Sequence, residues 1–156
     1  MVLTQQQQDT KKAVIAQLLA DKEASYRAMM EQQQADLGEA METQEEEQNL
    51  FEDGKVDQSI NRVEARASVV EALARDIDIL SNLDSVEPND NIQLGDILET
   101  DRGNFIVAVA ADEFEVNGTA YRGISTNSPL FKALVGKKEG DSAEVNGVSY
   151  TVNAAY

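Results

Sequence analysis

Residues 42–57 read ETQEEEQNLFEDGKVD, a stretch that holds seven carboxylates against a single lysine. Segments rich in helix-forming residues lie on both sides of it, at about residues 9–48 and 56–77. Asp53-Gly54 is a signal for a helix stop and a turn, because glycine readily adopts the positive φ that ends a helix. The stretch therefore predicts the tip of an antiparallel two-helix hairpin, with acidic residues gathered at the turn.

The segment after this tip carries a clear coiled-coil pattern. Its apolar and small residues follow one another at alternating spacings of four and three: Val56, Ile60, Val63, Ala67, Val70, Ala74 and Ile77. Such alternation is typical of a coiled-coil seam and not of a strand. The segment before the tip has a looser stripe, interrupted by Lys22 and Gln33: Ile15, Leu18, Lys22, Tyr26, Met29, Gln33, Leu37 and Met41. The glutamines at 5–8 fit a frayed helix start or a disordered lead-in, and the frayed start is the favoured interpretation.

Composition excludes several classes of site. The chain has 156 residues, a formal net charge of −16, and neither cysteine nor histidine. Disulfides, zinc sites built on cysteine or histidine, thiol nucleophiles and Ser-His-Asp triads are therefore excluded. Direct binding of duplex DNA is not expected, because the sequence has no basic patch that could displace the counterions of DNA. The N-terminus lacks the pattern of a signal peptide and no run is long enough to span a bilayer, so we expect a cytoplasmic protein that binds no membrane.

After position 83 the pattern changes from helix to strand. Residues 84–91 are polar, include a proline and are interpreted as a linker. Ile97–Thr100 and Asn104–Ala110 are short strand candidates. Two Asn-Gly pairs, at 117–118 and 146–147, predict tight hairpin turns because both residue types tolerate positive φ.

One short helix is expected among these strands, from about Pro129 to Val135. Ser128 can cap it, Pro129 suits its first turn, and Gly136 can end it. The whole sequence thus predicts an α+β protein. Its parts would be a coiled-coil hairpin over residues 1–83 with an acidic tip near 42–57, a linker over 84–91, and a small antiparallel sheet domain with one short helix over 92–156.

Residues 124–141, ISTNSPLFKALVGKKEGD, resemble the C-terminal domain signature of the bacterial Gre transcript-cleavage factors, GreA and GreB. In that family a serine-proline pair precedes a short helix, and a Gly-Lys-Lys-x-Gly-Asp turn follows it. Gre proteins also place a coiled-coil hairpin before a C-terminal domain of FKBP-like fold. The resemblance implies a transcription factor that binds RNA polymerase at its secondary channel and modulates elongation or transcript cleavage. It makes five residues candidates for partner binding: Asn127, Ser128, Pro129, Lys137 and Lys138.

The resemblance also implies a role for the acidic tip. Gre tips reach the catalytic magnesium site of the polymerase, where carboxylates help to hold a metal ion, and hard divalent cations prefer oxygen ligands. The chain would then have no catalytic residue, cofactor or metal site of its own, and any Mg²⁺ would be shared with RNA polymerase. The tip candidates are Glu45, Glu46, Glu47, Glu52 and Asp53. Cleavage-competent Gre tips carry a Gly-Asp-Leu-Ser-Glu-Asn-Ala-Glu-Tyr type of run that is missing here, so both stimulation and inhibition are open.

Other interpretations stay beside this one. The hairpin could serve as a protein-interaction or assembly module that pairs with another hairpin and has no role at the polymerase. Prolyl isomerisation, which an FKBP-like fold suggests, is disfavoured because the chain has no tryptophan and no evident aromatic pocket cluster. Taken alone, Glu45–Glu47 would also fit a solvated helix face, and Ser128-Pro129 would fit the start of a helix. The sequence leaves the oligomeric state open.

Overall fold

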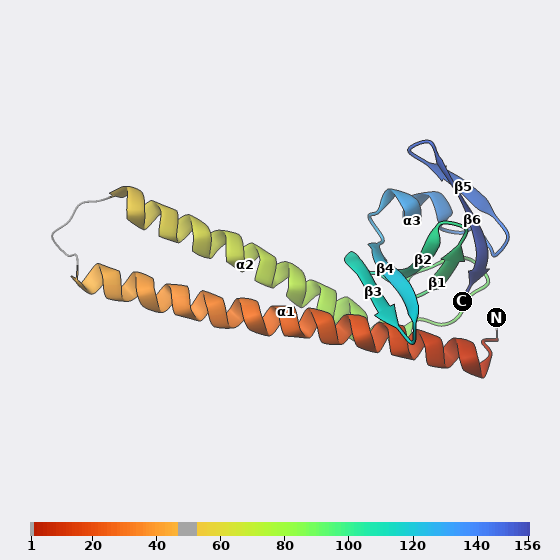
Figure 1. Ribbon diagram of the computed structural model, residues 1–156, viewed down its shortest axis with the longest axis horizontal. Coiled ribbons are helices and arrows are strands. Elements are labelled where there is room, and N and C mark those ends of the chain that lie inside the picture. The colour runs from red at the N-terminus through yellow and green to blue at the C-terminus, as the bar shows by residue number, and fades with distance from the viewer. Residues whose placement is uncertain (1, 47–52) are drawn as a thin grey trace. The chain divides into compact units, whose positions relative to one another are not determined.

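The computed structural model describes the backbone of residues 2–46 and 53–156 and the side chains of residues 2–35 and 64–156. Two long helices precede a six-stranded sheet with one short helix, so the α+β prediction is confirmed (Figure 1). The elements are α1 (Gln5–Glu46), α2 (Asp53–Ser81), the 3₁₀ turn η1 (Leu83–Ser85), β1 (Ile97–Thr100), β2 (Gly103–Ala108), β3 (Ala111–Val116), β4 (Thr119–Ser125), α3 (Pro129–Leu134), β5 (Ser142–Val145) and β6 (Val148–Ala155). None of the helices in these described ranges has the length and apolar character that crossing a membrane requires.

Contacts divide the chain into two compact units. The helical unit comprises Asp21–Ile77, and the sheet unit comprises Met1–Ala20 together with Asp78–Tyr156. The start of α1 therefore belongs with the strands, whereas the sequence suggested a hairpin over residues 1–83 and a separate domain from residue 92.

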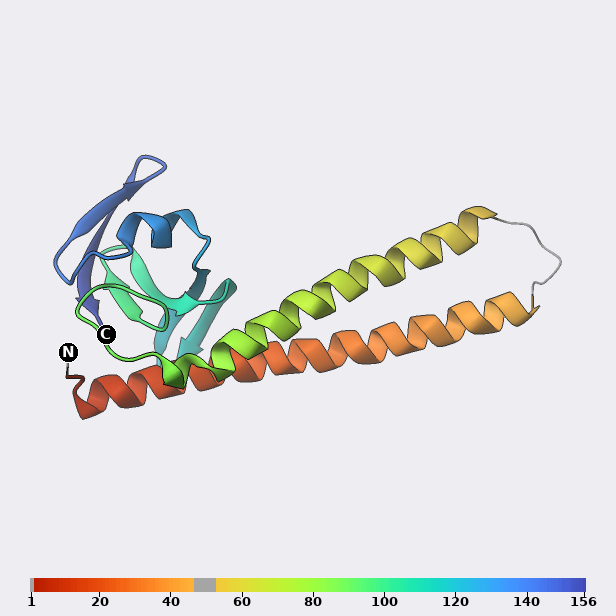
Figure 2. The same cartoon turned by 180° about the vertical axis from the view of Figure 1, so that it is seen from behind.

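In the helical unit, α1 and α2 run side by side in opposite directions (Figures 1 and 2). The predicted stripe of α1 is confirmed where side chains are described, because Lys22, Tyr26, Met29 and Gln33 are each partly buried. Lys22 interrupts the apolar pattern for a reason. Its Nζ lies 3.2 Å from Oδ2 of Asp76 on α2, so an ion pair replaces an apolar contact between the helices.

The seam of α2 differs from its prediction at one position. Ala67, Val70 and Ile77 are partly buried as expected, but Ala74 is exposed and Leu73 is partly buried instead. A leucine side chain gains more than a methyl group from leaving water, so it is favoured at the contact. The predicted seam residues Leu37, Met41, Val56, Ile60 and Val63 have side chains outside the described part.

The predicted stop at Asp53-Gly54 is wrong. Helix α2 begins at Asp53, and Gly54 lies in its first turn. An acidic residue at the start of a helix interacts favourably with the helix dipole, which favours Asp53 as a beginning and not as an end. Since α1 ends at Glu46, the connection between the helices falls inside residues 42–57.

The sheet has the strand order β3-β4-β2-β1-β6-β5. Every neighbouring pair is antiparallel except β2 and β4, which are parallel, so the prediction of a wholly antiparallel sheet needs correction. The reason is topological. Strand β4 lies between β2 and β3, and β3 runs in the direction opposite to β2. A strand that is antiparallel to β3 is therefore parallel to β2. The two Asn-Gly turns are confirmed, with φ of 52° and 81° at Asn117-Gly118 and 52° and 80° at Asn146-Gly147.

Helices cover both faces of this sheet. Strand residues alternate between the faces, so Ile97 and Leu98 of β1 enter different cores. One core joins α1, the end of α2 and the sheet through Val14, Leu18, Leu80, Leu83, Ile97, Ile106, Ala108, Val109, Tyr121 and Tyr156. The other lies under α3 and comprises Ile92, Leu98, Phe105, Val107, Leu130, Phe131, Leu134, Val152 and Ala155. The start of α1 thus provides one wall of the core.

The start of α1 is capped, so the predicted fraying of the glutamine run is wrong. Thr4 Oγ1 accepts a hydrogen bond from the backbone N–H of Gln7 at 3.1 Å, and Gln7 Oε1 accepts one from the backbone N–H of Thr4 at 3.0 Å. This reciprocal pair is a capping box, which satisfies N–H groups that a helix start otherwise leaves without partners. The signal was present in the sequence as a threonine followed three residues later by glutamine.

Candidate functional site

Three of the five acidic tip candidates lie in the described ends of the long helices. Glu45 and Glu46 lie in the last turn of α1, and Asp53 is the first residue of α2. Glu47 and Glu52 lie outside the described residues, as do the side chains of the other three. Among the residues that are described, no group of three or more acidic side chains is arranged to hold a metal ion.

The predicted partner-binding residues begin at the start of α3. Ser128 is the helix cap, because its Oγ accepts a hydrogen bond from the N–H of Phe131 at 3.1 Å, and Pro129 follows in the first turn. The N–H of Asn127 donates to Oγ of Ser125 at 3.3 Å. The side chains of Asn127 and Pro129 are exposed, so they are accessible to a partner, whereas the hydroxyl of Ser128 caps the helix.

The turn after α3 explains much of the Gly-Lys-Lys-x-Gly-Asp pattern. Gly136 and Gly140 have φ of 78° and 92°, values that favour glycine. Asp141 closes the turn, because its Oδ2 accepts a hydrogen bond from the N–H of Lys138 at 2.9 Å. Residue type at these three positions is therefore set by the local backbone.

The two lysines of this turn have different roles. Nζ of Lys137 donates to the carbonyl of Ser142 at 2.9 Å, and its own carbonyl accepts from the N–H of Ile92 at 2.7 Å. Lys137 is therefore a structural residue that ties the turn to neighbouring segments. Lys138 is exposed, and so is the nearby Val135, whose exposed fraction is 49%. Of the predicted lysine pair, Lys138 has the accessible side chain.

A charged pair that the sequence did not reveal lies between α1 and the sheet. Asp96 is only 4% exposed, and its Oδ2 accepts a hydrogen bond from the N–H of Gln93 at 3.1 Å. Nζ of Lys11 lies 3.9 Å from Oδ1 of Asp96. Burial raises the pKa of Asp96 to about 6, against the opposing effects of the Gln93 N–H and of Lys11. Burial likewise lowers the pKa of Lys11, with Asp96 acting in the opposite direction.

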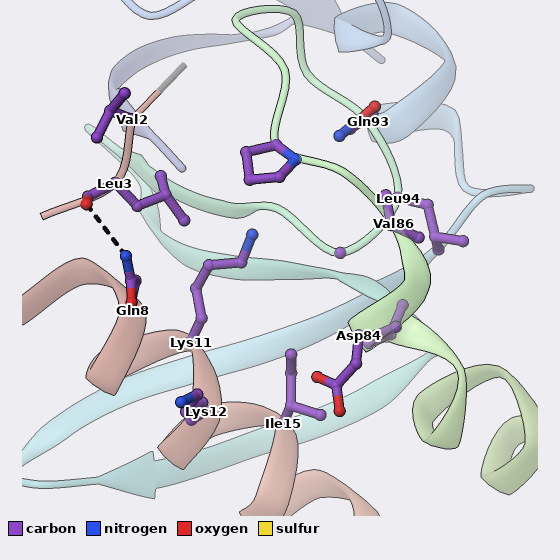
Figure 3. A pocket seen from close by; sticks show the side chains of 13 residues that line it. Val2, Leu3, Gln8, Lys11, Lys12, Ile15, Asp84, Val86, Gln93 and Leu94 are labelled. Atoms are coloured by element: carbon purple, nitrogen blue, oxygen red, sulfur yellow. Dashed lines mark hydrogen bonds between the residues drawn. The ribbon is translucent and has the colours of Figure 1, made fainter. Parts of the chain in front are cut away.

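Beside this pair is a cavity of about 440 Å³ (Figure 3). The first turns of α1 form one side and residues 83–95 form the other. Lys11 and Lys12 contribute from α1, and its apolar walls include Leu3 and Leu94. No local pattern could have predicted this cavity, because its two sides are distant in sequence and meet only through packing of α1 on the sheet.

A buried polar cluster lies in the core that α1 shares with the sheet. The hydroxyl of Tyr156 donates to Oε1 of Glu99 at 3.3 Å. Burial raises the pKa of Tyr156 well above its usual range, and the Glu99 carboxylate adds to the effect. Burial, followed by Glu99, also raises the pKa of Tyr121. Both phenols therefore stay protonated at neutral pH, and we assign the cluster a role in packing.

Replacing Asp96 with asparagine is expected to stabilise the protein at neutral and alkaline pH. The pKa of this carboxyl is about 6 in the folded protein and near 3.8 in its ordinary state, so the folded state binds the proton more tightly. Wild type therefore loses stability as the pH rises from about 4 to above 6, and D96N avoids that loss. We expect a gain of about 1 to 2 kcal/mol at pH 8, since Lys11 loses its partner and offsets part of the effect.

Urea denaturation of both proteins at a series of pH values measures this difference. The exposed Asp112 of β3 provides the control, because D112N makes the same chemical change at a side chain that is in contact with water. A D96N curve parallel to that of wild type between pH 4 and pH 8 would contradict the assignment.

Comparison with known proteins gives limited similarity. No family model matches the sequence, and no curated protein matches it. Among solved structures, the chain is similar to the structure of the transcription factor Gfh1, with 20% sequence identity and coverage of 88% of this chain and 92% of that chain. The TM-score of 0.34 is too low for a structural argument, so the fold assignment rests on the helices and strands described above.

Proposed function

We propose that this protein regulates transcription by binding RNA polymerase at its secondary channel. In this proposal the sheet unit docks on the polymerase, and the acidic connection between α1 and α2 acts within the channel. The observation that carries the proposal is the segment 124–141, whose sequence resembles the Gre C-terminal signature and which forms a serine-capped helix followed by a glycine-bounded turn. The pair of long helices with an acid-rich connection supports it further.

Docking is assigned to the exposed residues of this segment. Asn127 and Pro129 are accessible at the start of α3, and Lys138 is accessible in the turn after it. In a chain with net charge −16, an exposed lysine beside an exposed apolar residue such as Val135 complements an acidic partner surface with an apolar centre. Ser128 and Lys137 would support the surface by holding the helix and the turn in place.

Action is assigned to the acidic tip. Residues 42–57 carry seven carboxylates, and oxygen ligands of this kind interact favourably with Mg²⁺. The polymerase performs the chemistry in this proposal, and the chain supplies no catalytic residue and no resident cofactor. The tip then modulates elongation or transcript cleavage by contacting a metal ion that the polymerase holds, or by occupying the channel.

The test is capture of purified RNA polymerase from the source organism by two sets of variants. A tip variant replaces Glu45, Glu46, Glu47, Glu52 and Asp53 with alanine, and a docking variant combines Asn127→Ala with Lys138→Glu. We expect the tip variant to bind polymerase about as tightly as wild type. The docking variant should bind at least about tenfold more weakly, because Lys138→Glu reverses a charge at the contact and Asn127→Ala removes a polar side chain. A backtracked-transcript cleavage assay with wild type and tip variant then separates stimulation from inhibition.

A matched control uses exposed acids away from the tip. Asp112, Glu113 and Glu115 of β3 are exposed, and their replacement by alanine should affect neither capture nor transcript cleavage. If wild type does not bind polymerase, the proposal is contradicted and the alternative of an assembly module is favoured. Val69 of α2, with an exposed fraction of 46%, gives that alternative an apolar contact, and a stable dimer in sedimentation experiments would support it.

A further inference from the structure

The cavity beside Lys11 has the composition of a ligand pocket (Figure 3). Its volume of about 440 Å³ lies within the range of pockets that bind small molecules. Its walls are largely apolar and come from both sides, residues 3–15 and 83–95: Leu3, Ile15, Leu83, Val86, Pro88 and Leu94. Most of these side chains are at least partly buried, so the walls belong to the folded sheet unit.

Lys11 provides the polar feature of this pocket. Figure 3 shows its ammonium group reaching into the space between Leu3 and Leu94. The ammonium lies 3.9 Å from Asp96, which is beyond hydrogen-bond distance, and it makes no hydrogen bond to any residue in the described part of the chain. An ammonium group has three N–H donors, and a partly buried one favours acceptors that replace water. The donors of Lys11 are therefore available to a bound molecule.

The other charged groups around the pocket favour a negative ligand. Lys12 adds a second cation on the same helix, and Asp84 is the one carboxylate among the lining residues. In Figure 3 the Asp84 carboxylate is drawn well apart from the end of the Lys11 side chain. Asp96 is not among the lining residues: its Oδ1 lies 3.9 Å from Nζ of Lys11, and its Oδ2 accepts a hydrogen bond from the N–H of Gln93. The Lys11 ammonium at the centre of the pocket would repel a cationic ligand. An anion would instead accept hydrogen bonds from the N–H groups of Lys11.

We propose that this pocket binds a small organic anion, with a carboxylate or phosphate head at Nζ of Lys11 and an apolar body against Leu3, Ile15 and Leu94. The site is independent of the transcription function proposed above. A bound anion contacts both α1 and the segment 83–95, so it stabilises the packing of α1 on the sheet. By mass action, the melting temperature of the protein rises with the ligand concentration.

The test uses four probes that share one apolar body: octanoate, octyl phosphate, octanol and octylammonium. Each is titrated into the full-length protein while backbone amide signals are followed by NMR. We expect both anions to shift the signals of Lys11, Ile15, Leu94 and Gly95, and to bind at least about tenfold more tightly than octanol and octylammonium. The ratio between octanoate and octyl phosphate identifies which head group the site prefers. Equal binding of all four probes, or shifts located elsewhere, would overturn the proposal.

Variants test the role of Lys11 directly. Lys11→Met combined with Asp96→Asn removes both charges of the pair, so neither charge is left buried alone. This double variant should lose at least about tenfold in octanoate affinity and keep its affinity for octanol. The single variant Lys11→Arg keeps the positive charge and should bind the anions as wild type does. Lys132→Met removes an exposed lysine from α3 and serves as the charge-matched control, with no expected change. Undiminished anion binding by the double variant, with native amide signals, would contradict the assignment.

Discussion

Replacing Gly123 with alanine is expected to destabilise the sheet unit by about 3 kcal/mol or more. A Cβ atom at this position of β4 would lie 2.3 Å from the carbonyl oxygen of Val109 and 2.9 Å from Cβ of Ala111. The first of these neighbours is backbone, which cannot rotate away as a flexible side chain could. Relief requires β4 to move from its place between β2 and β3, and a loss of this size is a large part of the stability of a small domain.

Chemical denaturation, followed through NMR signals of the strands, measures this effect. Ala120 lies on the same strand and is exposed, so A120S adds one heavy atom to a side chain in contact with water. This control should change the stability by less than about 0.5 kcal/mol. A G123A protein with the stability of wild type would show that β4 has freedom to shift, in conflict with its close approach to Val109.

Replacing Leu18 with alanine is the second change with a large expected effect. Leu18 is fully buried in the core that α1 shares with the sheet, where it belongs to the same cluster as Leu80 and Ile97. Truncation of a buried leucine leaves a cavity and costs about 2 to 5 kcal/mol. Since the affected core is that of the sheet unit, we expect the strand signals to be lost at lower denaturant concentration, although the substitution is in a helix.

A fragment comparison extends this prediction. Residues 84–156 contain all six strands but lack Val14, Leu18 and Leu80, so the fragment should fail to give dispersed NMR signals. A well-folded fragment would show instead that residues 84–156 form an autonomous domain.

Val69→Ala is the control for Leu18→Ala, because Val69 is an exposed residue of α2 and its truncation should cost under about 0.5 kcal/mol.

Much of the fold follows from signals that act over a few residues. The two Asn-Gly turns form where positive φ is tolerated, and Ser128 caps α3 through a hydrogen bond to an N–H three residues later. Where side chains are described, the predicted stripe of α1 is confirmed even at Lys22, whose charge suggested an interruption. The predictions at Gly54 and at residues 5–8 are wrong because Asp53 favours the start of a helix over its end, and because Thr4 and Gln7 form a capping box.

The candidate site was only partly predictable. The segment 124–141 was found in the sequence, but only the structure separates Lys137, which is engaged with Ser142, from the exposed Lys138. Lys11 and Asp96 gave no signal at all, because neither has a distinctive local pattern. Their proximity depends on where α1 packs on the sheet.

The sequence by itself determined the helices, the turns, the caps and the concentration of carboxylates near residues 42–57, because each depends on neighbours along the chain. Tertiary structure alone decided the parallel pairing of β2 with β4, the burial of Leu73 in place of Ala74, and the cavity beside Lys11. These features result from contacts between distant segments, whose free energy comes from excluding water and filling space. Such contacts depend on the arrangement of the whole core, which no local pattern encodes.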